Sequence, residues 1–486
     1  MIRTATVLVV TILLLITFLP LASAGSVNPN SNTRTPIKHV IEIMMENHSF
    51  DNLFGAYPRD NNTSLKYLET NISRPVNLLT PGNHGELHRV PTGTFSTVDP
   101  GEGYTAYHID WNNGQMNGFV NGSGPQSMTY FTSSQAAPEW ILAEQYAMDQ
   151  SAYSMMTETT PNRLYNLAGF SPVMNDYGPP PYIPVTQSMF GELSHYSVSW
   201  NYYLLSKSDR YAPLNFFQGI NQYSSNIGSW ENFAGSVRNN TLPSVSWVMP
   251  VGSDSHGYYS QGPPNSILTG EMWMMYIVNL VMHSPEWNST AIFITYDEGG
   301  GYYDQVAPPV FNGMQLGQRV PFLLISPFAK ENYISSTVLD QGSIPAFIDY
   351  NWNLPALNSF VSGSNIALDM FDFNHPYSQG FIGRTPINLT SYGIPIPDNI
   401  VFTAGSTHGM NFSPIFPVDF QIPVTSLPYS ESGHSSFSLS SINSSLFVRS
   451  NSSFTPLYEN DLTIALILVT AVASSLWLPY LLRRRG

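Results

Sequence analysis

Two largely apolar segments of this chain each run directly into a group of polar residues. The segments are 37–45 and 291–296, and the polar residues that follow them are Glu46, Asn47, Asp297 and Glu298. A buried parallel strand that delivers side chains at its carboxyl end has this pattern. Because carboxylate and amide oxygens follow both segments, the sequence predicts one metal-centred site where two strands end.

Strand-like runs alternate with longer helix-compatible stretches between residues 37 and 375. We predict strands at 37–44, 244–249, 291–295 and 320–326, and helices at 272–283 and 343–352. Pro345 then lies in the first turn of the second helix, where proline is tolerated. Such alternation is typical of an α/β domain with a mainly parallel sheet flanked by helices. We therefore assign residues 37–375 to one catalytic domain.

The composition changes beyond residue 375, where Pro, Ser, Thr and Asn become frequent and the apolar pieces become short. We interpret 376–430 as a small β-rich appendage and 431–456 as a Ser/Asn-rich stalk. Residues 462–482 are almost wholly apolar and long enough to span a bilayer. The three arginines that follow them predict that the tail, 483–486, lies in the cytoplasm. A buried core helix is the alternative.

Residues 1–24 have the pattern of a signal peptide: Arg3, an apolar stretch, and Ala22-Ser23-Ala24 as a cleavage site. A retained N-terminal anchor is the alternative. Together with the C-terminal segment, this pattern predicts a single-pass protein of the cell membrane with its catalytic domain outside. Glycosylation sequons such as those at Asn61, Asn71 and Asn443 fit that location.

Composition excludes some classes of function. The chain has no cysteine, so it contains no disulfide, zinc-thiolate site or thiol nucleophile. Its formal net charge is −15, and this argues against a nucleic-acid partner.

A threonine-rich segment at 157–160 precedes a predicted helix. Pro161 suits the first helical position and Thr160 suits the N-cap. A helix N-terminus favours an anion, and a hydroxyl there that a metal activates can attack phosphorus. A capped helix without chemistry is the alternative, because capping threonines are common.

Taken together, these segments resemble the phosphoesterase family that holds bacterial phospholipases C and an acid phosphatase of the alkaline-phosphatase-like superfamily. The resemblance follows the chain in order through segments 39–55, 108–119, 159–165, 295–309, 319–329 and 340–355. It implies an alkaline-phosphatase-like sheet and a hydrolase of phosphate esters or phospholipids.

The resemblance also implies roles for particular residues. It assigns the nucleophile to Thr159, and it assigns a divalent metal to Glu46, Asn47, Asp297 and Glu298. Ligands that are all oxygen favour Mg, Ca or Mn. The alternative for Glu46 and Asn47 is that they cap a helix. The alternative for Asp297 and Glu298 is that they lie in a solvated turn.

For the substrate, the resemblance implies that His108 and His256 steady phosphoryl oxygens or protonate the leaving alcohol. It implies substrate binding for Asn162, Arg163, Asp304 and Arg319. The two arginines have a structural alternative, in which they tie loops together.

Three histidines of the family pattern are missing. Gln305 and Gln341 stand at two of these positions, and the third falls in the region of Glu102. Glutamine can hydrogen-bond phosphate but cannot donate a proton as an imidazolium does. A non-catalytic surface protein that keeps the fold is therefore the alternative to the enzyme.

Overall fold

The structure is a computed structural model of the chain. It describes residues 33–57, 76–77, 86–87, 89–176, 182–205, 213–250, 259–374 and 387–388. The predicted signal peptide, stalk, membrane segment and tail lie outside the described residues, as do His256 and nearly all of the appendage. Within the described residues, no helix combines the length and the apolar character needed to cross a membrane.

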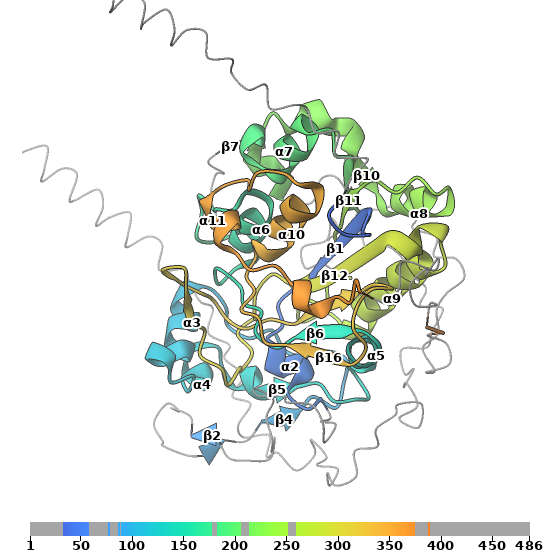
Figure 1. Cartoon of the computed structure of the whole chain (residues 1–486). Coiled ribbons are helices and arrows are strands. Elements are labelled where there is room, and N and C mark those ends of the chain that lie inside the picture. The colour runs from blue at the N-terminus through green and yellow to red at the C-terminus, as the bar shows by residue number, and fades with distance from the viewer. Residues whose placement is uncertain are drawn as a thin grey trace, which may run out of the picture. The chain divides into compact units, whose positions relative to one another are not determined.

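An eight-stranded sheet organises the described part of the chain (Figure 1). In spatial order its strands are β10 (Ile227–Ser229), β8 (Trp200–Leu204), β11 (Val245–Val248), β1 (His39–Met45), β12 (Thr290–Tyr296), β15 (Phe322–Ile325), β6 (Ala147–Asp149) and β16 (Tyr333–Ser335). Within this sheet β15 runs antiparallel to both of its neighbours, and the other pairs are parallel. The prediction of a mainly parallel α/β sheet is confirmed.

Short two-stranded pairings lie outside this sheet. They are β2 (Val76–Asn77) with β3 (Glu86–Leu87), β4 (Val90–Pro91) with β5 (Thr129–Tyr130), β7 (Ile183–Pro184) with β9 (Phe217–Gln218), and β13 (Val310–Phe311) with β14 (Met314–Gln315).

Helices pack in two groups beside the sheet (Figure 1). One group contains α5 (Ala137–Gln145), α8 (Trp230–Arg238) and α9 (Ile267–Met282), and the other contains α6 (Thr159–Ala168), α7 (Met189–His195), α10 (Ser343–Trp352) and α11 (Ser359–Gly363). Three further helices, α2 (Phe50–Phe54), α3 (Tyr104–Trp111) and α4 (Phe119–Gly122), lie in the connections. The sheet strands and most of these helices contribute to one hydrophobic core.

The predicted helices are found with different accuracy. Helix α10 has the predicted bounds, and Pro345 lies in its first turn. Helix α9 begins five residues earlier than predicted, at Ile267, because the apolar residues Ile267 and Leu268 extend it back to Ser266. Helix boundaries are the part of a helix that sequence patterns define least well.

The pairing of β1 with β12 determines where the site lies. Met45 is paired with Tyr296, so the two strands end level and Glu46 lies beside Asp297. Side chains alternate between the two faces of a strand. Glu42 of β1 accepts a hydrogen bond from Asn166 of α6, and Glu46 is therefore expected on the same face. The site consequently forms between the ends of these strands and α6.

A pair of buried carboxyl groups, Glu192 of α7 and Asp349 of α10, links two helices that cover the sheet. Burial raises the pKa of Glu192 to about 9, and the neighbouring Asp349 adds to the increase. Because this folded-state pKa lies above the ordinary glutamate value, the group stabilises the fold at acidic pH. That stability is lost as the pH rises through about 9.

We therefore expect the protein to be more stable to urea at pH 5 than at pH 9. Glu192→Gln should reduce this difference by at least about 1.4 kcal/mol, the free energy of one pKa unit. Glu231→Gln, a change at an exposed position of α8, is the control and should leave the difference unchanged. An identical pH dependence for Glu192→Gln and the unaltered protein would contradict this account.

Candidate active site

Arg163 joins the carboxylates at the ends of β1 and β12. Its guanidinium Nη2 contacts Glu46 Oε1 and lies 3.4 Å from Asp297 Oδ2. The arginine is 1% exposed, so this ion-pair network is shielded from water. Burial raises the pKa of Asp297 to about 7, Arg163 opposes the increase, and Glu46 adds to it. Helix α6 is thus held against both strand ends by charge.

Asn47 lies between the two strand ends in a left-handed conformation, with φ of 60°. Its backbone N–H donates to Asp297 Oδ1 at 3.3 Å. Gly300, with φ of 61°, packs so closely that a Cβ there would lie 2.1 Å from the Asn47 carbonyl oxygen. The two turns that follow the strands therefore interlock and fix the backbone of Asn47.

Thr159 faces the Asn47 side chain. The Thr159 hydroxyl lies 3.4 Å from Asn47 Oδ1, although the two residues are 112 positions apart. This is a long hydrogen bond, and Thr159 as a residue is 5% exposed. Five predicted site residues, namely Glu46, Asn47, Thr159, Arg163 and Asp297, are therefore brought together.

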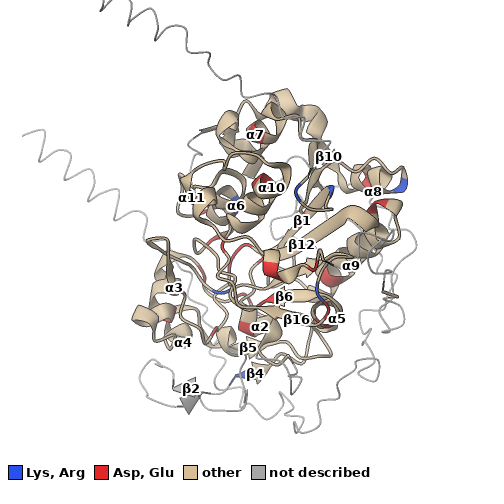
Figure 2. Ribbon diagram, in the orientation of Figure 1, with Lys and Arg blue, Asp and Glu red and all other residues tan. Residues whose placement is uncertain are grey.

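Glu298 and Glu102 extend the acidic cluster. Glu298 Oε2 accepts from the Gly300 N–H at 2.6 Å, and its buried Oε1 has no hydrogen-bond partner among the described residues. Glu102 arrives on the loop before α3, and its Oε2 accepts from Asn47 Nδ2 at 3.1 Å. Although Glu102 is exposed as a residue, desolvation and nearby Asp99 raise its pKa to about 8. Acidic residues gather between α3 and α6 in Figure 2.

The start of α6 differs from its prediction. The helix begins at Thr159, its N-cap position is Glu158, and no side chain of the N-cap residue bonds to the helix. The Thr160 N–H instead donates to Asp176 Oδ1 at 2.7 Å, so the prediction that Thr160 caps the helix was wrong. The Asp176 side chain, 16 residues along the chain, thus accepts from a backbone N–H at the start of the helix that an N-cap side chain would otherwise bond. Because Pro161 has no N–H, this first turn offers few amide donors to an anion.

Asn162 holds the turn that precedes Thr159. Its Oδ1 accepts from the N–H groups of Met155 at 2.7 Å and Met156 at 3.0 Å. Its Nδ2 donates to the carbonyl oxygens of Met156 and Glu158. The side chain is fully occupied by backbone groups, which gives Asn162 a structural role; its predicted substrate contact stays a prediction.

We expect Asn162→Ala to lower the free energy of unfolding by about 1–3 kcal/mol, because several backbone groups lose a buried partner. Urea unfolding measures this change. Asn365→Ala removes one partly buried bond to a backbone oxygen and serves as a milder control. If Asn162→Ala unfolded at the same urea concentration as the unaltered protein and changed only KM, the substrate-binding prediction would hold instead.

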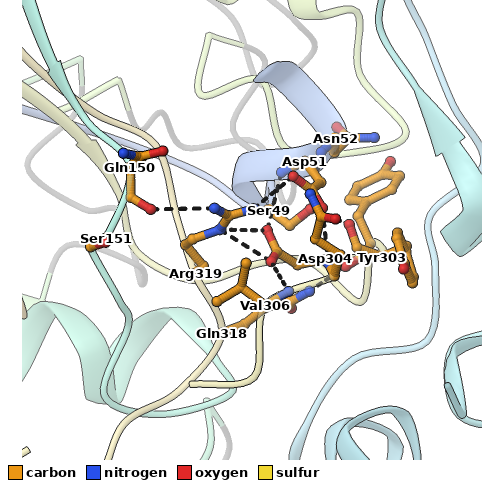
Figure 3. Close-up of polar contacts among 12 residues, drawn as sticks. Ser49, Asp51, Asn52, Gln150, Ser151, Tyr303, Asp304, Val306, Gln318 and Arg319 are labelled. Carbon is orange, nitrogen blue, oxygen red and sulfur yellow. Dashed lines mark hydrogen bonds and ion pairs between the residues drawn. The ribbon is translucent and has the colours of Figure 1, made fainter. Parts of the chain in front are cut away.

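Asp304 and Arg319 form a buried network below the site (Figure 3). Arg319 Nε donates to both oxygens of Asp304 at 3.1 Å, and Nη2 donates to Asp51 Oδ1 at 2.7 Å. All three side chains are 0% exposed. The alternative in which Arg319 ties loops together explains these contacts, and substrate binding by Asp304 and Arg319 stays a prediction.

Of the two predicted histidines, only His108 lies among the described residues, and it makes no hydrogen bond to this cluster. His108 is exposed on α3, where its Nδ1 bonds to the Tyr104 carbonyl oxygen at 2.8 Å and its ring packs on Tyr104. Gln341, which stands where the family has histidine, donates to the carbonyl oxygens of Tyr296 and Asp297. This glutamine therefore supports the end of β12.

Comparison with known proteins identifies the group to which this site belongs. The model of the Phosphoesterase family matches residues 37–355, which is most of the chain. The chain belongs to the Phosphoesterase family. This phosphoesterase is a hydrolase that acts on phosphoric esters.

Its curated relatives include bacterial enzymes. Phospholipase C A of Mycobacterium tuberculosis is 26% identical over 430 residues, covering 75% of this chain and 80% of the relative. Hemolytic phospholipase C of Pseudomonas aeruginosa is 26% identical over 406 residues, covering 68% of this chain and 55% of the relative. Among solved structures, an alkaline phosphatase superfamily protein from Vibrio parahaemolyticus matches with a TM-score of 0.35 and 8% identity, covering 71% of this chain and 74% of that one.

The metal prediction can be compared with the side chains. Among the described residues, no group of three or more His, Cys, Asp or Glu side chains is arranged to hold a metal ion. Arg163 contacts two of the carboxylates assigned to the metal, Glu46 and Asp297. The donors themselves suit a hard divalent cation, because they are carboxylate, amide and hydroxyl oxygens. The unpaired, buried Oε1 of Glu298 is an atom that such a cation would satisfy.

Proposed function

We propose that this phosphoesterase is a metal-dependent hydrolase in which Thr159 attacks phosphorus. The observation that carries the proposal is the contact between the Thr159 hydroxyl and the amide of Asn47, beside Asp297. Residues from three distant segments thus place one hydroxyl against a dense group of oxygen ligands. Glu46, Asn47, Asp297 and Glu298 would hold the cation.

The proposed reaction has two steps. In the first, the Thr159 hydroxyl gives up its proton, Oγ1 forms a bond to phosphorus, the bond from phosphorus to the leaving oxygen breaks, and the leaving alcohol takes up a proton. In the second, water attacks phosphorus, the Oγ1–P bond breaks, and Thr159 regains its proton. A bound divalent cation would favour the ionised hydroxyl and stabilise charge on the phosphoryl oxygens. His108 and His256 are predicted either to steady the phosphoryl oxygens or to protonate the leaving alcohol.

Arg163 positions the carboxylates for this chemistry. It is held by α6, the same helix that begins with Thr159, and it contacts Glu46 and Asp297. The nucleophile and the carboxylates are consequently fixed relative to one another by a single helix. Such preorganisation is a large part of catalysis by phosphoryl-transfer enzymes.

For the substrate, we propose a phospholipid or another phosphodiester, as the names of the relatives suggest. A phosphomonoester, as in acid phosphatases, is the second candidate of the same class. The full-length protein, purified in detergent, should be assayed with phosphatidylcholine vesicles and with p-nitrophenyl phosphate. Turnover should disappear with a chelator and return with Mg²⁺, Ca²⁺ or Mn²⁺. Absence of turnover on every substrate with every metal would favour the non-catalytic surface protein.

We also propose the location that the sequence predicts, a single-pass protein anchored through 462–482 with the catalytic domain outside the cell. This anchor would hold the site close to lipid. A chain ending at residue 460 should be released into the medium, whereas the full chain should stay with the membrane fraction. Retention of both chains in the membrane fraction would contradict the proposed anchor.

A further inference from the structure

The side-chain amide of Asn47 has two orientations, and only one of them suits the proposed site. With Oδ1 toward Thr159, the amide presents an oxygen to the nucleophile and to a cation. With Nδ2 in that place, it would present two N–H donors, which repel a cation. The backbone of Asn47 is already fixed by its bond to Asp297 and by the packing of Gly300. Rotation of the amide is the freedom that remains.

Glu102 is the group that selects between these orientations. Its Oε2 lies 3.1 Å from Asn47 Nδ2, on the side of the amide away from Thr159. Glu102 Oε2 accepts this hydrogen bond, and only the NH₂ end of an amide can donate one, so the contact holds the NH₂ end of Asn47 toward Glu102. The contact therefore directs Asn47 Oδ1 toward the Thr159 hydroxyl.

The loop that carries Glu102 is itself held firmly. The Gly101 N–H donates to the Ser123 carbonyl oxygen at 2.9 Å. Gly301, with φ of 67°, lies against Gly101, because a Cβ on Gly301 would come within 2.3 Å of the Gly101 oxygen. Gly103 has φ of 92° and faces Glu158, the residue before Thr159. These packed glycines fix the position of Glu102 relative to the turn after β12 and the start of α6.

We propose that Glu102 is a positioning residue of this phosphoesterase, which fixes the amide of Asn47 with its oxygen toward Thr159 and the cation. Partners of metal ligands orient those ligands in this way, and their removal typically costs ten- to a hundredfold in metal affinity. The inference rests on the proposed function, because it assumes that Asn47 is a metal ligand. It gives a role to Glu102, which lies in the region where the family pattern has a histidine that this chain lacks.

Binding of Mn²⁺ alone to the full-length protein, measured by calorimetry in detergent, tests the inference without relying on activity. Glu102→Ala should weaken binding by about ten- to a hundredfold, because the amide of Asn47 is free to rotate. Glu102→Gln should stay within about threefold of the unaltered protein if its carbonyl oxygen still accepts from Asn47 Nδ2. Glu231→Gln removes one negative charge from an exposed position of α8 and is the charge control, with unchanged binding.

The outcomes separate this inference from the proposed function. Loss of Mn²⁺ binding in Asn47→Ala, together with normal binding in Glu102→Ala, would overturn the positioning role and leave the metal site standing. Equal losses in Glu102→Gln and Glu102→Ala would also overturn it, because the charge rather than the orientation of Asn47 would then be required. Normal Mn²⁺ binding in Asn47→Ala would contradict the proposed metal site itself. Thermal unfolding of each variant verifies that the fold is retained.

Discussion

Replacing Thr159 with alanine will reduce turnover of the phosphoesterase by about 10⁴-fold or more, the loss typical of a removed nucleophile. The fold should remain, because the Thr159 hydroxyl makes one long contact, to Asn47. Steady-state kinetics on the substrate that proves active measures the loss. Thr159→Ser should keep part of the activity, because serine retains the hydroxyl.

Thr160→Ala is the matched control for this experiment. The sequence alone predicted that the Thr160 side chain caps α6, but the backbone N–H of Thr160 makes the bond to Asp176. Alanine keeps that N–H, so Thr160→Ala should retain turnover. If Thr160→Ala abolished turnover and Thr159→Ala did not, the nucleophile would be Thr160.

Arg319→Ala will lower the free energy of unfolding by about 3–5 kcal/mol, because it leaves Asp51 and Asp304 buried without their cation. Urea unfolding measures the change. Arg238→Ala, at an exposed arginine of α8 that bonds to Tyr276, is the control and should cost less than about 1 kcal/mol.

The same pair of variants decides between two roles for Arg319. If Arg319 has a structural role, Arg319→Ala lowers the urea concentration at which half of the protein is unfolded. If Arg319 binds substrate, Arg319→Ala raises KM and leaves the urea midpoint unchanged. The second result would restore the prediction that Arg319 contacts the phosphate, against the buried geometry in Figure 3.

The parts of the fold that sequence patterns predict are those with local causes. The largely apolar runs before Glu46 and before Asp297 form β1 and β12, and each strand ends one residue beyond its predicted end. Helix α10 is confirmed for the same reason, since its apolar spacing and its early proline agree. The convergence of Glu46, Asn47 and Asp297 then follows from the parallel register of two strands.

The parts that could not be predicted depend on contacts between distant segments. The beginning of α6 is determined by Asp176, which follows the helix, so the local cap pattern at Thr160 was misleading. The sequence marks the region of Glu102 only as lacking a family histidine, yet Glu102 contacts Asn47, 55 positions away. A glutamate between two glycines gives no periodic signal, and only the packing of Gly101 against Gly301 brings it to the site.

Arg163 is an intermediate case. The sequence indicated a cationic residue near the phosphate, and the structure brings Arg163 into the site but pairs it with Glu46 and Asp297. A single sequence does not reveal whether an arginine neutralises a substrate or its own carboxylates. That distinction requires the distances between the groups.

The central claim is that Thr159 forms a covalent bond to phosphorus during turnover. A rapid-quench experiment tests this bond most directly. The full-length protein is mixed with substrate and quenched with acid within milliseconds, and its peptides are mapped by mass spectrometry. The account predicts a phosphoryl or phosphoalcohol adduct on Thr159 that forms with substrate, disappears as substrate is exhausted and is absent from Thr159→Ala. An adduct on another residue, with Thr159 unmodified throughout turnover, would contradict it.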